Sequence, residues 1–416
     1  MKKRVKRYWH TLGPGLVVGA SDDDPSGIAT YSQTGAQYGT RFLWLALFTF
    51  PLTGVVQEMC ARIGIVTKKG LAANMREHFP KPVLMTVTVL LLATNIFNIG
   101  ADLGAIGEAA KLVFPSVHPD VFIILAGVLS IMLQVFIPYA NYAKYLKYLA
   151  LVLVSYIATA FFIKFDWSEI FRHTLIPHIT FAKDQLLLIC AVLGTTISPY
   201  LFFWQTSQEV EEEELHEREG TQNMIDQNLK NMNADVWIGM FVSNVVMFFI
   251  IAVSGAVLHM QGIHTIASAA DAASALRPFA GDFAYLLFAV GIIGTGMLAI
   301  PVLAGSSAYA LSEMMHWNFG LNKKLGEAYA FYGVIALSIV VGIILNFVGI
   351  DPIDALIYSA VGNGIVAPFV LYFIVRIASN KNVMGNYASG PWKSAIGWIT
   401  FLLMSLAAVA VIVGLF

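Results

Sequence analysis

Long apolar segments recur along the whole of this chain and leave few architectures open to it. Eleven of them are long enough to cross a bilayer, which takes about 20 apolar residues in a helix. They occupy approximately residues 13–38, 42–64, 83–110, 120–138, 146–164, 184–208, 236–259, 283–312, 329–348, 353–375 and 395–415. Only 12% of the 416 residues are charged, against about 25% in soluble domains. The pattern predicts an all-α integral membrane protein with a single transmembrane domain over residues 1–416.

Basic residues are distributed unevenly between the two sides of the membrane that this topology creates. With a cytoplasmic N-terminus, 19 of the 25 Lys and Arg residues lie on the cytoplasmic side and six on the outer side. The larger set includes the basic start Met1–Arg7, which lacks a signal-peptide cleavage site, and Lys144 and Lys147. Because basic residues accumulate in cytoplasmic loops, we expect a multi-pass protein of the inner (plasma) membrane with its N-terminus inside and its C-terminus outside.

The first apolar segment contains three consecutive carboxylates, Asp22, Asp23 and Asp24, followed at once by the helix-breaking sequence Pro25-Ser26-Gly27. Acidic side chains at membrane depth are costly, and they mark ion or proton pathways. A helix broken at that depth survives only where it faces protein or a water-filled cavity. The segment therefore predicts an ion-binding site in a transporter, and not an enzyme.

A second break lies in the sixth apolar segment, where Leu193–Tyr200 interrupts an apolar helix with small residues, hydroxyls and a proline. Interrupted segments at matching places in two halves are typical of inverted-repeat transporters, whose substrates bind where the half-helices meet. We therefore expect a first repeat over about 13–164, a second over about 184–375, and an extra helix at about 395–415.

The residues beside the two breaks suggest how a cation would be held. Asp24 abuts the first break, where its carboxylate and freed backbone carbonyls can share an ion. Asp22 and Asp23 either line the aqueous approach, or one of them is protonated. Thr195 and Ser198, three residues apart, offer hydroxyl and carbonyl oxygens on one helix face. A site of carboxylate, hydroxyl, carbonyl and water suits magnesium, calcium or manganese.

Three groups of motifs make the chain resemble the NRAMP family of divalent-metal transporters. They are Gly13-Pro14-Gly15 leading into Asp24-Pro25-Ser26-Gly27 and Gln33–Gly39, then Gln57–Thr67, and finally the break at Pro199. With the eleven-span layout, the resemblance covers essentially the whole chain. It implies a LeuT-like inverted 5+5 repeat with broken helices 1 and 6, plus an eleventh helix. It also implies import of a divalent cation, with no cofactor besides the transported ion, by a monomer in the bilayer that binds no nucleic acid.

The chain departs from the family motifs at the places that matter for selectivity. The family's first motif ends in an asparagine that ligates the metal, and Gly27 stands there. In the sixth-helix Met-Pro-His motif, Ser198 replaces the methionine and Tyr200 the histidine, while Thr195 matches the residue that gives a carbonyl ligand. Loss of a soft thioether favours hard cations, and a roomier site suits an ion that keeps several waters. The pattern is similar to the NRAMP-related magnesium transporters.

Comparison with the family's motifs also predicts that proton coupling is weak or absent. The family's proton route uses an aspartate and a glutamate on the third helix, together with histidines of the sixth. Asp102 is retained, but Ala105 stands at the glutamate position. Tyr200 and Gln205 replace the histidines, and neither titrates near neutral pH. Glu108 either substitutes for the missing glutamate or is simply solvated.

Four further features each allow two interpretations. Asn363, in the tenth segment, either packs helices together or contacts the hydration shell of the ion. Glu58 and Glu313 are expected to be solvated or paired with basic groups. The acidic stretch Glu209–Glu219 is either a solvated helix extension or a vestibule that attracts cations by its field.

Alternative functions follow from the same residues. The nearest is a proton-coupled Mn²⁺/Fe²⁺ symporter of the ordinary family type. A sodium-coupled amino-acid symporter would share the breaks but usually lacks an acid at the metal position. A prenyltransferase would bind magnesium diphosphate through the aspartates, but it needs a second intramembrane acidic cluster that the sequence does not contain.

Overall fold

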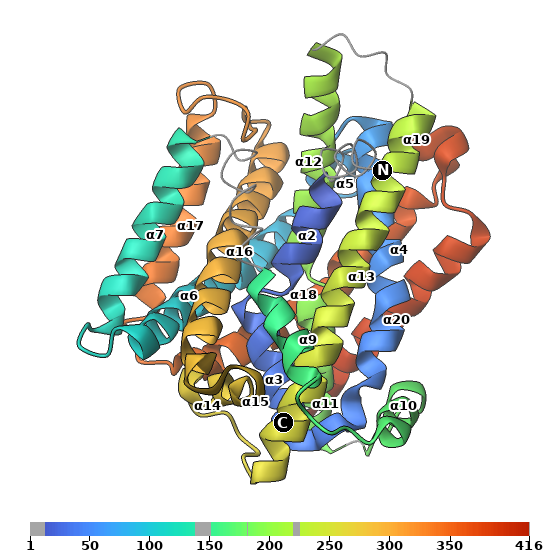
Figure 1. Ribbon diagram of the computed structural model, residues 1–416. Helices are drawn as coiled ribbons and strands as arrows, with labels where there is room; N and C mark the ends of the chain where they lie inside the picture. Colours follow the sequence, from blue (N-terminus) through green and yellow to red (C-terminus); the bar gives the residue numbers. More distant parts are fainter. Residues whose placement is uncertain (1–12, 138–150, 181, 219–224, 416) are drawn as a thin grey trace, which may run out of the picture.

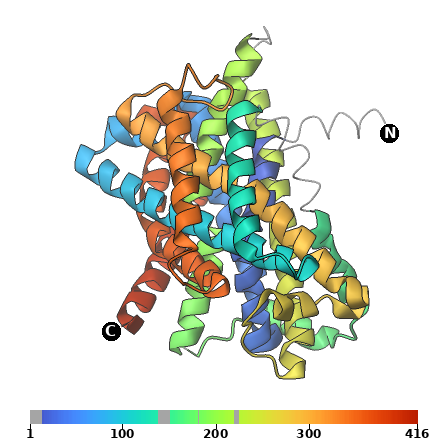
Figure 2. The same ribbon diagram turned by 90° about the vertical axis from the view of Figure 1, so that its left-hand side faces the viewer.

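The computed structural model describes residues 13–137, 151–180, 182–218 and 225–415, most of which are helical (Figures 1 and 2). The main helices are α2 (Pro14–Asp22), α3 (Pro25–Tyr38), α4 (Trp44–Thr67), α5 (Leu71–His78), α6 (Lys81–Val113), α7 (Pro119–Phe136), α9 (Val154–Ala160), α10 (Trp167–Leu175), α11 (Lys183–Thr196), α12 (Pro199–Arg218), α13 (Ile225–Val257), α16 (Ala284–Met315), α17 (Tyr329–Leu345), α18 (Pro352–Ala378) and α20 (Pro391–Leu415). Short connecting helices and turns are η1 (Gly39–Phe42), η2 (Leu151–Leu153), η3 (His259–Gln261), α14 (Ala269–Ser274), α15 (Arg277–Ala280), η4 (Gly281–Phe283), α19 (Lys381–Met384) and η5 (Gly385–Tyr387).

Helices occupy the positions of the predicted membrane segments. Within the described ranges, eight helical segments are long and apolar enough to cross a membrane. They match the second, third, fourth, sixth, seventh, eighth, tenth and eleventh predicted spans. The first span is divided into α2 and α3, and the ninth is the shorter helix α17. Helix α9 covers part of the fifth span. The rest of that span before residue 151 lies outside the described residues, as do Met1–Arg7, Lys144, Lys147 and Glu219.

The two broken helices lie at the centre of the bundle. Helix α13 packs along α2, α3 and α4, while α18 packs against α11, α6 and α3. Helix α12 contacts α4 and α16. Figure 1 shows α2 and α3 between α13 on one side and α6 and α16 on the other, with α7 and α17 farther out. Both breaks are therefore enclosed by protein, as helix ends inside a bilayer require.

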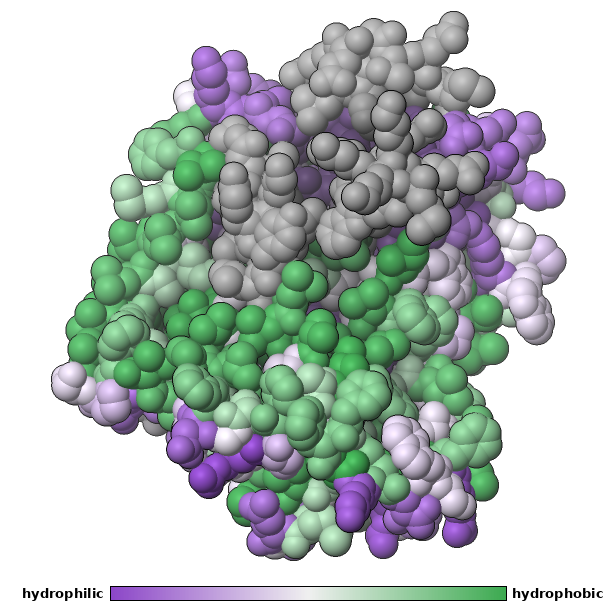
Figure 3. All heavy atoms as spheres, viewed as in Figure 1, coloured by the Kyte–Doolittle hydropathy of each residue, from purple (hydrophilic) through white to green (hydrophobic). Residues whose placement is uncertain are grey.

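The first helix and the last point to opposite ends of the molecule. Helix α2 begins at the end where α5 lies, whereas α20 runs toward the other end, where α10, α14 and α15 gather (Figures 1 and 2). Figure 3 shows a hydrophobic band between two hydrophilic ends, as expected for a bilayer-spanning protein. Which end faces the cytoplasm stays a prediction.

Local sequence explains why each central helix stops where it does. Asp24 is the extended N-cap of α3, and Pro25 is its first residue. Ser198 stands between α11 and Pro199, which begins α12. Proline fits the first turn of a helix because that turn needs no amide donor. It also pushes the preceding residue out of the helical conformation. Each Xaa-Pro pair thus ends one helix and begins the next.

Helix α2 approaches α13 very closely. A Cβ on Gly19 would collide with the backbone of Gly239, and one on Gly15 would lie 2.7 Å from the amide nitrogen of Val236. The carboxylate of Asp235 on α13 accepts the amide of Gly15 at 2.7 Å. Small residues and a cap at the free amides of the first turn thus hold the first half-helix against α13.

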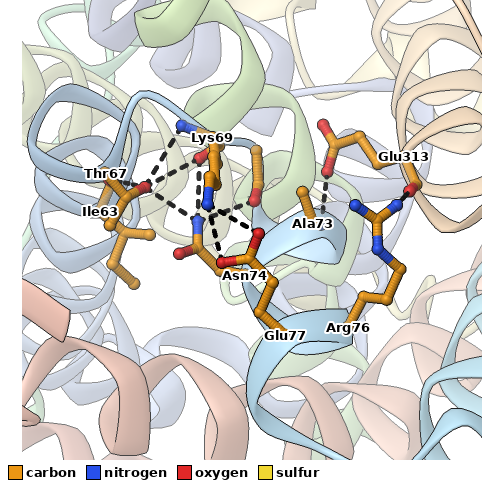
Figure 4. Close-up of polar contacts among 9 residues, drawn as sticks. Ile63, Thr67, Lys69, Ala73, Asn74, Arg76, Glu77 and Glu313 are labelled. Atoms are coloured by element: carbon orange, nitrogen blue, oxygen red, sulfur yellow. Dashed lines mark hydrogen bonds and ion pairs between the residues drawn. The ribbon is translucent and has the colours of Figure 1, made fainter. Parts of the chain in front are cut away.

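Two carboxylates near the α5 end of the molecule differ in their surroundings. Glu58 pairs with Arg62 at 2.9 Å and with Lys393 at 3.0 Å, which confirms the predicted pairing. Glu313 is buried and binds the amide of Ala73 at 3.0 Å, at the start of α5 (Figure 4). The prediction of a solvated or ion-paired Glu313 was wrong, because a helix N-terminus supplies its donor.

The acidic stretch after the second break continues α12 to Arg218, so the predicted helix extension is confirmed. The prediction that this extension is solvated was wrong for three of its acids, because Glu209, Glu211 and Glu213 are all buried. Glu211, for example, accepts hydrogen bonds from the Tyr309 hydroxyl and the Leu321 amide. Glu213 likewise accepts from Asn228 of α13 at 2.6 Å, whereas Glu209 accepts from Gln205 of its own helix.

Candidate functional site

Asp24 lies at the first break with both carboxylate oxygens engaged. Its Oδ1 accepts the Ser26 hydroxyl at 2.6 Å and the Gly27 amide at 2.7 Å. Its Oδ2 is approached by Asn98 Nδ2 of α6 at 3.1 Å and by the Tyr200 hydroxyl of α12 at 3.4 Å. The residue is only 1% exposed. Protein donors thus replace water around this carboxylate, as burial of a polar group requires.

Asp22 and Asp23 are buried as well, but they face α13. The hydroxyl of Ser243 lies 2.5 Å from Asp22 Oδ2 and 3.4 Å from Asp23 Oδ1. Asp22 Oδ1 has no hydrogen-bond partner within the described part of the chain. Both predicted roles, lining the aqueous approach or carrying a proton, stay predictions.

The second break contains only neutral oxygens. Backbone carbonyls there accept hydrogen bonds from serine and threonine hydroxyls. The Ser198 hydroxyl lies 2.5 Å from the Thr195 carbonyl and 2.8 Å from that of Gly194. The Thr53 hydroxyl of α4 donates to the Thr196 carbonyl at 3.1 Å. These carbonyls belong to the last turn of α11, where helix geometry leaves carbonyls without backbone partners. Hydroxyl groups therefore satisfy the end of this half-helix.

Gly27 and Tyr200 connect the two breaks. A Cβ on Gly27 would lie 3.2 Å from Thr195 Oγ1 and 3.1 Å from the Asp22 carbonyl. The Tyr200 hydroxyl donates to the carbonyl of Ser21 at 3.1 Å, in the last turn of α2. The structure thus brings together the five predicted residues Asp24, Gly27, Thr195, Ser198 and Tyr200.

Asp102 lies on the same face of α6 as Asn98, one helical turn further on. It is fully buried and close to the backbone amide of Ser26, at the start of α3. Neither of its oxygens makes a hydrogen bond of ordinary geometry within the described residues. Ala105 is buried beyond it, and Glu108 is half-buried. The retained aspartate thus stands next to the site, while the position of the family's glutamate contributes no charge.

Within the described residues, Asn363 has no hydrogen bond that connects it to the site. It is buried in α18, and neither polar atom of its side chain has a hydrogen-bond partner in the described structure. Its neighbour Gly364 packs against the backbone of Gly194 in α11. No recorded hydrogen bond joins Asn363 to either break, so its role stays a prediction.

Three partners of the site were not predicted from sequence. Asn98 and Ser243 bind the aspartates of the first break, and Thr53 caps the second. Each is a polar residue inside a long, largely apolar helix. One signal was available, since Asn98 precedes Asp102 by four residues and therefore shares its helix face.

The groups that the two breaks could offer to a cation are oxygens. In the described ranges, no group of three His, Cys, Asp or Glu side chains is arranged to hold a metal ion. A cation between the breaks must therefore combine a carboxylate with carbonyls, hydroxyls and water, a donor set that suits hard ions. Two thioethers approach hydroxyl groups beside the second break: Met240 Sδ is 3.4 Å from Thr53 Oγ1 and Met247 Sδ is 3.9 Å from Thr196 Oγ1.

Comparisons with known proteins identify the family to which the chain belongs. Residues 15–414 match the model of the family described as natural resistance-associated macrophage protein-like. A divalent metal cation transporter, MntH, of Pectobacterium carotovorum is 25% identical over 400 residues, which cover 94% of this chain and 91% of that protein.

Solved structures show the same fold. A manganese transporter of Eremococcus coleocola superimposes with a TM-score of 0.77 at 18% identity, covering 98% of this chain and 87% of that one. Mhp1, a nucleobase-cation-symport-1 family transporter, gives 0.60 at 14% identity, covering 97% and 91%. The fold is therefore all-helical and LeuT-like, as predicted.

Proposed function

Because this chain belongs to the natural resistance-associated macrophage protein-like family, we propose that it imports a hard divalent cation, Mg²⁺ or Mn²⁺, across the inner membrane. The ion binds between the two breaks, with Asp24 as its charged ligand and Thr195, Ser198 and the backbone at Gly27 around it. Transport proceeds by alternating access and is weakly coupled or uncoupled to protons. The protein is a transporter and not an enzyme, a monomer, with its N-terminus in the cytoplasm.

One observation supports this proposal above the others. Hydroxyl groups donate hydrogen bonds to the backbone carbonyl oxygens at the two breaks, which are the oxygens that would coordinate a cation. The Ser21 carbonyl is held by Tyr200, that of Thr195 by Ser198, and that of Thr196 by Thr53. A hydroxyl can rotate and offer a lone pair instead of its proton. The same groups that satisfy the two helix ends can therefore turn their oxygens toward an arriving ion.

Helix polarity favours a cation at the same place. Helices α2 and α11 both end at the breaks, so the negative ends of their dipoles point there. Two half-helix C-termini and unwound carbonyls are a recurrent arrangement for coordinating ions at the midplane of transporters. Asp24 adds the full negative charge that a divalent ion requires. Its present donors must yield at least one oxygen when the ion binds.

The proposed preference for Mg²⁺ follows from what the site lacks. Ser198 supplies a hard hydroxyl where the family has a thioether, and Gly27 has no side chain where the family has an asparagine ligand. Mg²⁺ dehydrates reluctantly and usually keeps several waters when bound. A site with one carboxylate and several neutral oxygens can hold such an ion through its hydration shell.

Proton coupling is proposed to be weak because titrating partners are sparse at the site. Gln205, which stands at one of the family's histidine positions, donates to Glu209 at 2.6 Å and carries no proton of its own to exchange. Asp102 favours the alternative, a proton-coupled Mn²⁺/Fe²⁺ symporter, because it is a buried carboxylate without ordinary hydrogen bonds beside α3. Both functions use the same fold and the same Asp24.

Flux measurements on purified protein in liposomes distinguish the two. Magnesium-sensitive and manganese-sensitive dyes are enclosed in parallel with a pH dye, and a membrane potential is imposed. We expect entry of Mg²⁺ and Mn²⁺ with little acidification above that of protein-free liposomes. Mn²⁺ entry that acidifies the lumen, with no Mg²⁺ entry, establishes the alternative.

A further inference from the structure

A cavity lies apart from the ion site, at the end of the molecule where α2 begins. It has a volume of about 460 Å³ and lies between the ends of α5 and α18, the short helix α19 and the start of α20. Its polar wall is His78, Arg376, Ser379 and Asn380. Its apolar wall is Phe79, Val375, Ile377, Val383 and Trp398. The volume is in the range of small-ligand sites, roughly 300–1,000 Å³.

The charge of this cavity is not neutralised by the protein. Arg376 lines it and is exposed. Lys81 and Lys381, also exposed, stand within two residues of lining residues. Within the described part of the chain, none of these three cations is recorded in an ion pair or hydrogen bond. The lining contains no carboxylate.

The acids nearest to α5 are already engaged. Glu77 binds Lys69 at 2.7 Å, and Glu313 holds the amide of Ala73 (Figure 4). Arg76 is engaged as well, because it donates to the backbone carbonyl of Glu313. The cavity is therefore an unneutralised basic site, and a bound anion would complete it.

Aromatic residues place the cavity at the boundary between headgroups and acyl chains. Phe79 meets Phe373 with ring centroids 4.6 Å apart, and Trp398 contacts Tyr372 at 5.9 Å and Phe401 at 5.6 Å. Tryptophan and tyrosine collect at this level of membrane proteins. We therefore expect the polar wall at headgroup depth and the apolar wall, which includes Val383 and Trp398, on the acyl-chain side.

From this combination we infer that the cavity binds an anionic phospholipid of the surrounding bilayer. The guanidinium of Arg376 pairs with the phosphodiester oxygens, for which its planar fork is suited. The hydroxyl of Ser379 and the amide of Asn380 reach headgroup hydroxyls, and an acyl chain lies along Val383 and Trp398. Basic pockets between transmembrane helices commonly take anionic headgroups. A soluble phosphate ester shares the headgroup chemistry but leaves the apolar wall uncovered.

Native mass spectrometry of the full-length protein in detergent tests this inference. Phosphatidylglycerol and phosphatidylcholine with identical acyl chains are added in equal amounts, and the bound lipid is counted. We expect a preference for phosphatidylglycerol of roughly fivefold, the scale of a single cation at a charged surface. Arg376→Gln should reduce the preference to near one, and Val383→Trp should lower the binding of both lipids by filling the cavity.

Arg277→Gln is the matched control, since it removes an exposed arginine at the opposite end, where Arg277 lies 3.8 Å from Asp282. It should keep the wild-type preference. An unchanged preference in Arg376→Gln overturns the inference, and so does an equal loss in Arg277→Gln. Glycerol phosphate is added in a separate arm at the lipid concentration. If it displaces the bound lipid, the ligand is a soluble phosphate ester and the lipid assignment is wrong. The melting temperature of each variant verifies that it is folded.

Discussion

The two helix breaks at the centre of this protein are alike in backbone, but the first is acidic and the second is neutral. Each ends one half-helix before an Xaa-Pro pair, and each leaves last-turn carbonyls that hydroxyl groups occupy. The first break adds carboxylates, of which Asp24 faces the second break through Tyr200. The second break contains no ionisable group among Leu193–Pro199.

This difference suggests that the first break provides the binding energy for the ion and the second provides the selectivity. A charged ligand determines whether a divalent ion binds at all, because a dehydrated cation in a protein interior needs an opposite charge. Neutral ligands contribute less energy each, but their softness and spacing discriminate between ions. We therefore expect substitutions at the first break to change the amount of transport, and those at the second to change the choice of ion.

The largest effect is expected from Asp24→Asn. Asparagine keeps the size of the side chain and also caps helices well, so α3 should still form. Loss of the charge should lower Mg²⁺ and Mn²⁺ uptake into liposomes at least about a hundredfold, corresponding to the roughly 3–5 kcal/mol of an unpaired buried charge. Asp23→Asn is the control, since Asp23 faces Ser243 and not the second break. An equal loss in that variant would contradict the assignment of Asp24.

A tenfold change in selectivity is expected from Ser198→Met. The thioether restores a soft ligand, so uptake of Mn²⁺ or Cd²⁺ relative to Mg²⁺ should rise by about tenfold. Because Ser198 is fully buried, any larger side chain also crowds the site. Ser198→Leu has nearly the same volume as the methionine variant and no sulfur, and thus isolates the effect of softness. Equal ion ratios in the two variants would refute a role for ligand softness.

Much of the fold was predictable because the membrane imposes it. Apolar runs of about 20 residues can only be helices there, and the predicted spans coincide with helices throughout the described ranges. The breaks were predictable for the same reason, since Asp24-Pro25 and Ser198-Pro199 cannot continue a helix. Solvation was harder to predict. Glu209 and Glu313 look like exposed acids in the sequence but are buried against neighbouring segments.

The pairing within the site could not be predicted from sequence. Asn98 and Asp24 are 74 residues apart, and Ser243 and Asp22 are 221 apart. One polar residue in an apolar helix does not say which partner it meets, because that depends on how distant helices pack. The hydrogen bonds between hydroxyl groups and carbonyls are equally hard to predict from sequence, since serine and threonine commonly bond within their own helix. Sequence motifs thus pointed to the candidate ligands, and the structure shows which distant side chains bind them.

A smaller effect than either of these is expected from Tyr200→Phe, and the direction of the change in KM decides how the breaks cooperate. The hydroxyl donates to the Ser21 carbonyl at 3.1 Å and lies 3.4 Å from Asp24 Oδ2. If it competes with the ion for these oxygens, its removal should lower the KM for Mg²⁺ about two- to tenfold, the equivalent of one hydrogen bond. A raised KM would instead make the Tyr200 oxygen itself a ligand. Thr53→Val removes the corresponding donor at the second break. It should change KM less, because the carbonyl that it frees is not next to a carboxylate.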